Sequence, residues 1–291
     1  PLESYSKLFN SQSFELENGL KVVVIENNRA PVVTQMLWYN AGSKDEPYGK
    51  SGIAHFVEHL MFKGTKNFPG GYFSNFISKN GGTENAFTSF DYTAYYQVVP
   101  SSKIEKIVEL EADRMTNLTL TQEQVEIEKK VILEERNQRI DSNPSSVLDE
   151  SMRKSLFPHH TYGIPIIGWR HEIEALQYED VLDFYTKFYN PSNATLIFSG
   201  DISLKKAKIL ANKYYGTTRL WWILAHANKL GEGSFIIPPG TRIRVPQEIG
   251  KILDELIANQ FRIENFKNRN LSAVLSKSKI KWSIESYLDQ L

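Results

Sequence analysis

The chain of 291 residues is long enough to bury a large core in one or two domains, and its 41% hydrophobic and 12% aromatic content argues against disorder. Lys and Arg balance Asp and Glu at 34 each, so the net charge gives no reason to expect a nucleic acid or an anionic membrane as partner. No apolar run approaches the roughly 18 residues that a membrane span needs. The absence of cysteine excludes disulfides and thiolate zinc ligands, which leaves histidine and carboxylate as ligands.

The first 40 residues have the sequence pattern of β-strands. Three strands are predicted over residues 14–16, 20–26 and 32–40, with an Asn-Gly hairpin signal between the first two. A polar loop then leads into the run from Ser51 to Gly64, which predicts a short buried helix with Ser51 as its N-cap and Gly64 just past its end.

This helix carries the sequence His55-Phe-Val-Glu58-His59. Positions four apart lie one above the other on a helix, so the two imidazole rings can converge on one point with Glu58 alongside. Two histidines at this spacing supply two ligands of a zinc site, and the carboxylate beside them can act as general base toward a water that the metal activates. The order H-x-x-E-H is the inverzincin signature. The alternative is a buried helix whose two histidines are satisfied by hydrogen bonds. The remaining faces are apolar and predict packing in a core: Ile53, Phe56, Val57 and Leu60.

A helix over 72–79 and strands over 83–90 and 92–99 follow. In the strand at 83–90, Glu84, Ala86 and Thr88 share one face, so neither face is uniformly apolar. Such a strand suits an exposed sheet edge that receives a peptide by β-augmentation, although an ordinary edge strand without a ligand explains the pattern equally well.

A long helix predicted over 121–140 opens with a capping box at Thr121 and Gln124 and supplies a third candidate ligand. Glu135 falls about 20° from Glu128 around this helix. The arc around both is predicted to be apolar: Val125, Val131 and Ile132. A carboxylate on a buried face must be neutralised, paired or bound to a metal. Arg139 offers an ion pair as the alternative, but the histidine pair favours Glu135 as a zinc ligand, with Glu128 in support.

The remaining elements are helices over 103–117, 144–156, 178–189 and 203–215, and a strand over 194–199. His159 and His160 are adjacent in a loop, where neighbouring side chains diverge, so we expect them to be solvated rather than metal-binding. Mixed strands and helices without βαβ regularity or a phosphate-binding glycine loop predict a two-layer α+β domain.

These residues together resemble the pitrilysin/insulinase family of zinc metallopeptidases, which includes the mitochondrial processing peptidase. That family carries H-x-x-E-H followed about 75 residues later by E-x6-E, and here His59 and Glu135 are 76 positions apart. Four further blocks are similar to recurrent family blocks, at residues 18–22, 81–88, 162–168 and 189–196. The resemblance covers roughly residues 8–216.

The resemblance implies a mixed, largely antiparallel sheet backed by helices. It implies Zn²⁺ as cofactor, bound by His55, His59 and Glu135. It assigns Glu58 as the catalytic base and Glu128 as an accessory acid. It also places Asn85, Ala86 and Phe87 on the edge strand that holds an extended substrate. Family members pair this domain with a second homologous domain or subunit, which encloses the substrate and supplies Arg and Tyr groups for the oxyanion.

The family pattern stops after residue 218. Residues 219–291 hold 11 Lys and Arg against 7 Asp and Glu, and the run at 237–246 is weakly similar to segments of phage baseplate and cell-wall-binding proteins. We therefore expect a catalytic domain at 1–218 and a distinct segment at 219–291, either a phage-like module or a chimeric tail. No second copy of the domain is evident. The chain begins at Pro1 rather than Met, as expected of a fragment or after removal of a leader, and the compartment stays open between bacterial cytoplasm and periplasm.

The sequence thus predicts a zinc endopeptidase that hydrolyses extended peptides. One alternative is a non-catalytic homologous subunit that needs a partner domain. Another is a phage or cell-wall structural module whose function lies in the C-terminal segment.

Overall fold

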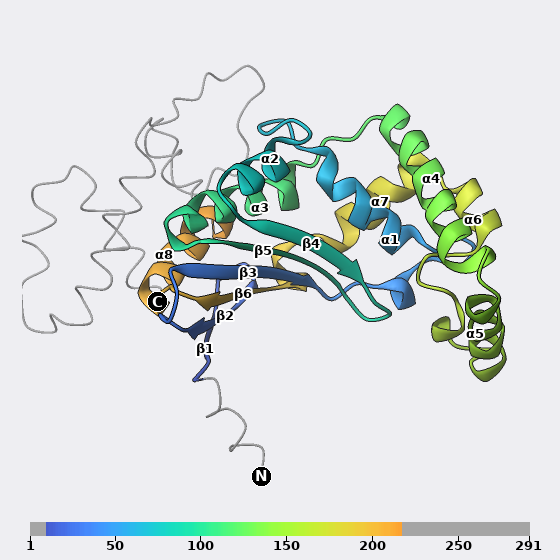
Figure 1. Cartoon of the computed structure of the whole chain (residues 1–291), viewed down its shortest axis with the longest axis horizontal. Coiled ribbons are helices and arrows are strands. Elements are labelled where there is room, and N and C mark those ends of the chain that lie inside the picture. Colours follow the sequence, from blue (N-terminus) through green and yellow to red (C-terminus); the bar gives the residue numbers. More distant parts are fainter. Residues whose placement is uncertain (1–9, 217–291) are drawn as a thin grey trace, which may run out of the picture. The chain divides into compact units, whose positions relative to one another are not determined.

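The computed structural model describes residues 10–216, and the distinct segment expected at residues 219–291 lies outside this range. The described chain forms one six-stranded sheet in the order β1-β2-β6-β3-β5-β4 (Figure 1). The strands are β1 (Gln12–Glu15), β2 (Lys21–Glu26), β3 (Val32–Tyr39), β4 (Thr83–Thr88), β5 (Thr93–Pro100) and β6 (Ala194–Gly200). Four of the five pairings are antiparallel, and β2 with β6 is the parallel one. The prediction of a mixed, largely antiparallel sheet is confirmed.

Eight α-helices lie among the described residues: α1 (Ile53–Leu60), α2 (Tyr72–Lys79), α3 (Ile104–Asn117), α4 (Gln122–Arg136), α5 (Pro144–Leu156), α6 (Arg170–Ala175), α7 (Tyr178–Phe188) and α8 (Leu204–Tyr215). The bounds of α2 and α5 agree with the sequence prediction, as does the capping box of α4 at Thr121 and Gln124. The short helix α6 was not predicted. No described helix is long and apolar enough to cross a membrane.

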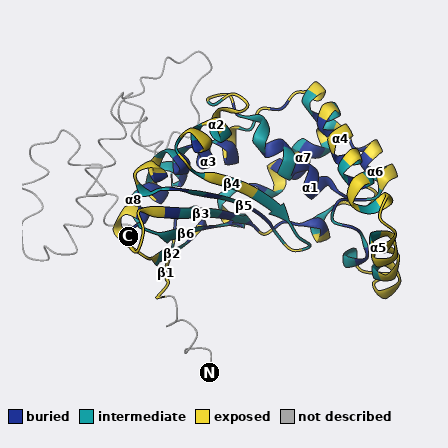
Figure 2. Cartoon of the chain, in the orientation of Figure 1, coloured by how far each residue is buried: buried dark blue, intermediate teal, exposed yellow. Residues whose placement is uncertain are grey.

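Alternation along the strands explains why the helices cover one face of the sheet. In β3, every second residue is fully buried (Val33, Gln35, Leu37 and Tyr39), whereas Thr34, Met36 and Trp38 are only partly covered. Successive strand residues point to opposite faces, so the buried set defines the face on which α1, α3 and α8 pack. Figure 2 shows the buried residues concentrated between the sheet and these helices. The apolar faces of α1 predicted to enter the core are buried as expected: Ile53, Phe56, Val57 and Leu60.

The start of α1 differs from the prediction. Ser51 is not the N-cap; that position is taken by Gly52, whose φ of 86° lies in the left-handed region. A Cβ at Gly52 would lie 2.4 Å from the carbonyl oxygen of Ile167, so a residue with a side chain does not fit there. A carboxylate from the preceding loop takes the place of the expected side-chain cap. Glu46 accepts hydrogen bonds from Gly52 N and Ala54 N, both at 3.0 Å.

The predicted helix over 121–140 ends earlier than expected. After Arg136 the chain forms a wide π-helical turn over Asn137–Asp141. The apolar arc around Glu135 is also narrower than predicted, because Val125 and Ile132 are buried while Val131 is 47% exposed. Packing of α4 against α1 and α6 covers only part of the expected arc.

Candidate metal centre and cleft

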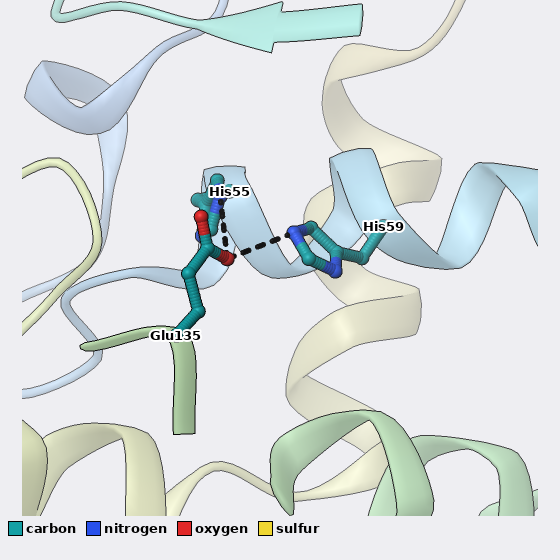
Figure 3. A group of neighbouring side chains, drawn as sticks. All are labelled: His55, His59 and Glu135. Atoms are coloured by element: carbon teal, nitrogen blue, oxygen red, sulfur yellow. Dashed lines mark ion pairs between the residues drawn. The ribbon is translucent and has the colours of Figure 1, made fainter. Parts of the chain in front are cut away.

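Two histidines and a glutamate meet where α1 packs against α4. His55 and His59 project from α1, and Glu135 approaches them from the last turn of α4 (Figure 3). Glu135 Oε2 lies 3.7 Å from His55 Nε2 and 3.4 Å from His59 Nε2. One ligand atom from each of the three lies within 4.8 Å of the other two. The fold therefore brings His55 and Glu135 together although they are 80 positions apart in the sequence.

This group fits a zinc ion. Two imidazole nitrogens and one carboxylate oxygen are the donor set of catalytic zinc sites that keep an open fourth position. A tetrahedral ion with bonds of about 2.1 Å separates its ligand atoms by about 3.4 Å, close to the two nitrogen–oxygen distances here. Within residues 10–216 no other set of His, Cys, Asp and Glu side chains meets the same proximity. His159 and His160 are exposed and separate from the group, in agreement with the prediction.

Glu128 fixes the orientation of His59. Its Oε1 lies 2.9 Å from His59 Nδ1, which leaves Nε2 directed toward Glu135. The other oxygen, Oε2, is paired with Lys63 Nζ at 2.5 Å. A hydrogen bond on the far nitrogen of a metal-binding histidine holds its tautomer and ring angle. Glu128 thus contacts His59, the ligand that we expected it to support, and its contact with Lys63 was not predicted.

The two histidines differ in their electrostatics. Burial lowers the pKa of His55 to about 4, and the neighbouring His59 adds to this effect. Burial also acts against the charged form of His59, but its hydrogen bonds to Glu128 and Glu135 prevail and raise its pKa to about 9. The carboxylates therefore favour a proton on His59 over one on His55. A zinc ion must displace that proton when it binds.

The end of α4 is anchored beside Glu135. Arg136 is buried, and its guanidinium donates to the carbonyl oxygen of Gly168 at 2.7 Å and to both carboxylate oxygens of Glu150 on α5 at 2.9 and 3.0 Å. On the exposed side, Arg139 Nη1 lies 2.8 Å from Glu135 Oε1. The ion pair considered as the alternative for Glu135 is therefore present, and it uses the oxygen that does not face the histidines.

Glu58 is the remaining acid on α1. Burial raises the pKa of Glu58, while a hydrogen bond from the hydroxyl of Thr88 lowers it in part. Thr88 is the last residue of β4, and its Oγ1 lies 2.5 Å from Glu58 Oε2. Glu58 Oε1 accepts no hydrogen bond from any described residue. The carboxylate is thus tied by one oxygen and open at the other.

A cleft of about 840 Å³ runs past this group, between β4 on one side and α5 with the loop at 163–167 on the other. Its walls include His55, Glu58 and Glu135. The three predicted substrate residues, Asn85, Ala86 and Phe87, also line it. Because β4 is the last strand of the sheet, its outer N–H and C=O groups have no strand partner in the described sheet. An extended peptide in the cleft could pair with this edge.

Thr88 and Lys63 were not singled out from the sequence as parts of the site. Strand alternation placed Thr88 on the face that it shares with Ala86, but nothing in the sequence showed which face of the strand lies toward α1. Lys63 directly precedes Gly64, the residue predicted to lie just past the end of the histidine helix. In the structure it follows α1 in a short helical turn, Met61–Lys63, from which its ammonium reaches Glu128.

Residues 21–169 match the family described as Insulinase (Peptidase family M16), and residues 175–247 match the Peptidase M16 inactive domain. The second match extends into the segment that the sequence prediction separated at residue 219.

Among curated proteins, the chain is similar to the zinc protease PqqE of Helicobacter pylori, with 30% identity over 303 residues, 99% of this chain and 66% of that protein. It is 32% identical over 206 residues to the probable mitochondrial-processing peptidase subunit beta of Schizosaccharomyces pombe, covering 71% of this chain and 45% of that one. A solved structure of a protease from Helicobacter pylori superposes with a TM-score of 0.69 and 34% identity, covering 71% of this chain and 50% of that chain. The chain thus spans between about half and two thirds of the length of these relatives.

Proposed function

The chain belongs to the insulinase family of peptidases, family M16, and from this premise we propose that residues 1–218 form the catalytic domain of a zinc endopeptidase that cleaves extended peptides. The observation that carries the proposal is the convergence of His55, His59 and Glu135 from two helices. Glu58 lies beside them in a cleft bordered by a sheet edge. The zinc protease name of the Helicobacter pylori relative agrees with this chemistry.

Zinc bound by His55, His59 and Glu135 would polarise the scissile carbonyl and lower the pKa of an attacking water. Glu128 holds the His59 ring so that Nε2 faces the site. The free edge of β4 pairs with the substrate backbone and places a peptide bond next to Glu58. Glu58 takes a proton from the attacking water as the carbon–oxygen bond forms. It then delivers that proton to the amine nitrogen as the carbon–nitrogen bond breaks.

We infer that a second homologous domain or subunit, in a homodimer or a heterodimer, covers the cleft and supplies groups for the oxyanion. The relative from Schizosaccharomyces pombe is named as a subunit, and this chain matches under half of it. No nucleic acid or membrane span enters this proposal.

The test measures bound zinc and cleavage of a quenched, unstructured peptide on one preparation, with and without a chelator. We expect one zinc per chain and chelator-sensitive cleavage. Glu58→Gln should retain zinc and lose turnover by about 10²-fold or more, as expected for removal of a general base. His59→Ala should lose the metal. Full activity of the Glu58→Gln variant would refute the assignment of the base.

A non-catalytic subunit is the second candidate, because residues 175–247 match the Peptidase M16 inactive domain. One zinc per chain without cleavage, and without recovery of cleavage on adding a homologous second half, would favour it. Deletion of residues 219–291 tests the phage-module alternative, since a peptidase domain should keep its zinc without them.

A further inference from the structure

We propose that Thr88 is a positioning residue for the general base: its hydroxyl holds Glu58 in the one orientation that serves the reaction. The inference rests on the proposed function and adds a residue to it. It follows from the contact between the last residue of β4 and the carboxylate on α1.

The contact is short and selective. Thr88 Oγ1 donates to Glu58 Oε2 at 2.5 Å, within the range of hydrogen bonds from a hydroxyl to a carboxylate. Among residues 10–216, this hydroxyl is the one donor to Glu58. A glutamate side chain has three rotatable bonds, so a carboxylate without such a partner samples several rotamers. Tying Oε2 removes that freedom and leaves Oε1 as the oxygen that can receive a proton.

A neighbouring hydroxyl directs the Thr88 proton toward Glu58. Thr93 faces Thr88 across the β4–β5 pair, with the two Oγ1 atoms 3.4 Å apart. Thr93 is fully buried and donates its own proton to the carbonyl oxygen of Ala41 at 2.9 Å. The Thr88 hydroxyl has a single proton, and the charged acceptor at 2.5 Å is nearer than the neutral one at 3.4 Å. The Thr88 hydroxyl therefore donates to Glu58, and the hydroxyl behind it, that of Thr93, is fixed on the interior strand β5.

Strand β4 carries both Thr88 and the residues proposed to bind the substrate. In the proposed function, residues 85–87 of the same strand pair with the substrate backbone. One strand then aligns both the peptide, through its backbone, and the base, through the Thr88 side chain. Catalytic geometry is sensitive to displacements of about 1 Å, so a shared support keeps the two in register.

The test compares Thr88→Val, which keeps the shape and removes the hydroxyl, with Thr88→Ser, which keeps the hydroxyl and removes a methyl group. Thr83→Val is the matched control, because Thr83 is exposed at the opposite end of β4. All variants are loaded with zinc and checked for zinc content and thermal unfolding before kinetics. We expect Thr88→Val to lower kcat by about tenfold or more with KM within about twofold, whereas Thr88→Ser and Thr83→Val stay within about threefold of the parent.

A double-mutant cycle separates positioning from an independent effect. If Thr88 acts through Glu58, then Thr88→Val should not lower the turnover of Glu58→Gln further. A reduction by the same factor in both backgrounds would overturn the inference. So would parental kcat in Thr88→Val, or loss of kcat in Thr83→Val as well.

Two measurements that do not depend on catalytic turnover test the role of Thr88 separately from the proposed function. A peptide hydroxamate shares its proton with the base, so calorimetry should show about tenfold weaker binding to zinc-loaded Thr88→Val and little change for Thr88→Ser. Crystal structures should show one Glu58 rotamer in the parent and Thr88→Ser, and several in Thr88→Val. A parent chain that binds no zinc would refute the proposed function alone. A single unchanged Glu58 rotamer in Thr88→Val would refute the role of Thr88, whatever the metal content.

Discussion

Arg139 pairs with Glu135 through the oxygen that faces away from the histidines. Its Nη1 lies 2.8 Å from Glu135 Oε1, while Oε2 of the same carboxylate faces both imidazole rings. The pair spans one turn at the end of α4, where the chain widens into the π-helical turn. The geometry is compatible with metal binding through Oε2, so an ion pair and a ligand role for Glu135 do not exclude each other.

Replacing Arg139 should weaken zinc binding modestly. Partners of metal ligands typically contribute 10- to 100-fold in affinity, but the Arg139 side chain is 71% exposed and solvent screens its charge. We expect Arg139→Ala to raise the zinc dissociation constant by about three- to tenfold, measured by competition with a chromogenic chelator. Arg153→Ala is the control, since Arg153 lines the same cleft without contacting a ligand. An equal effect of both substitutions would show that zinc affinity depends on the total charge of the cleft and not on the contact of Arg139 with Glu135.

Replacing Glu128 should reduce zinc affinity more than replacing Arg139 does, because Glu128 is buried and contacts His59 directly. Glu128→Gln keeps the side-chain length and removes the charge, and we expect zinc affinity to fall by about tenfold or more. Lys63→Met removes the ammonium that pairs with the second oxygen of Glu128 and should produce a smaller loss in the same direction. Lys66→Met on the neighbouring loop serves as the control. Unchanged zinc affinity in Glu128→Gln would contradict its supporting role.

A comparison of Gly49 and Gly52 distinguishes the stability cost of a strained backbone from that of a steric clash. Gly52 and Gly49 both have positive φ, at 86° and 79°. A Cβ would meet the Ile167 carbonyl oxygen at 2.4 Å at Gly52, whereas nothing lies within 4 Å at Gly49. We expect Gly49→Ala to cost about 1 kcal/mol of unfolding free energy through strain, and Gly52→Ala distinctly more. Urea unfolding measures both. A Gly52→Ala variant as stable as Gly49→Ala would show that the loop at 165–168 yields readily.

Asp91 provides a pH-dependent contribution to stability. It lies in the β4–β5 hairpin, where hydrogen bonds from Lys44 and from Tyr162 hold its pKa below the ordinary value. A folded-state pKa below that of the unfolded chain means that the ionised carboxylate stabilises the fold above about pH 4, and that this contribution is lost as the pH falls through the folded-state pKa.

The variant Asp91→Asn should therefore melt below the parent at pH 7, and the gap should narrow as the pH drops below about 4. Asp183→Asn, at an exposed position of α7, is the control. Thermal unfolding across pH 3 to 7 checks this. A constant gap across that range would show that Asp91 acts through its shape rather than its charge.

Local patterns in the sequence determined the helices that carry the site. The spacing of His55 and His59 places both on one face of α1, because helical periodicity depends on near neighbours alone. The capping box at Thr121 and the proline at the start of α5 fixed helix starts for the same reason. Alternation along residues 83–88 correctly indicated an edge strand. Glu135 was suggested as a third ligand by its place on the predicted buried face of its helix, and its spacing from His59 supported this through resemblance, since no local rule connects residues so far apart.

Tertiary packing decided the rest. Only the contact of α1 with α4 brings Glu135 to the histidines, and only the β4–α1 contact brings Thr88 to Glu58. The N-cap of α1 moved from Ser51 to Gly52 because the loop carrying Ile167 passes too close for a side chain. Val131 stayed exposed because no described helix covers that side of α4. Each of these outcomes depends on contacts between distant segments, which become defined only when the hydrophobic faces of the sheet and helices are buried together.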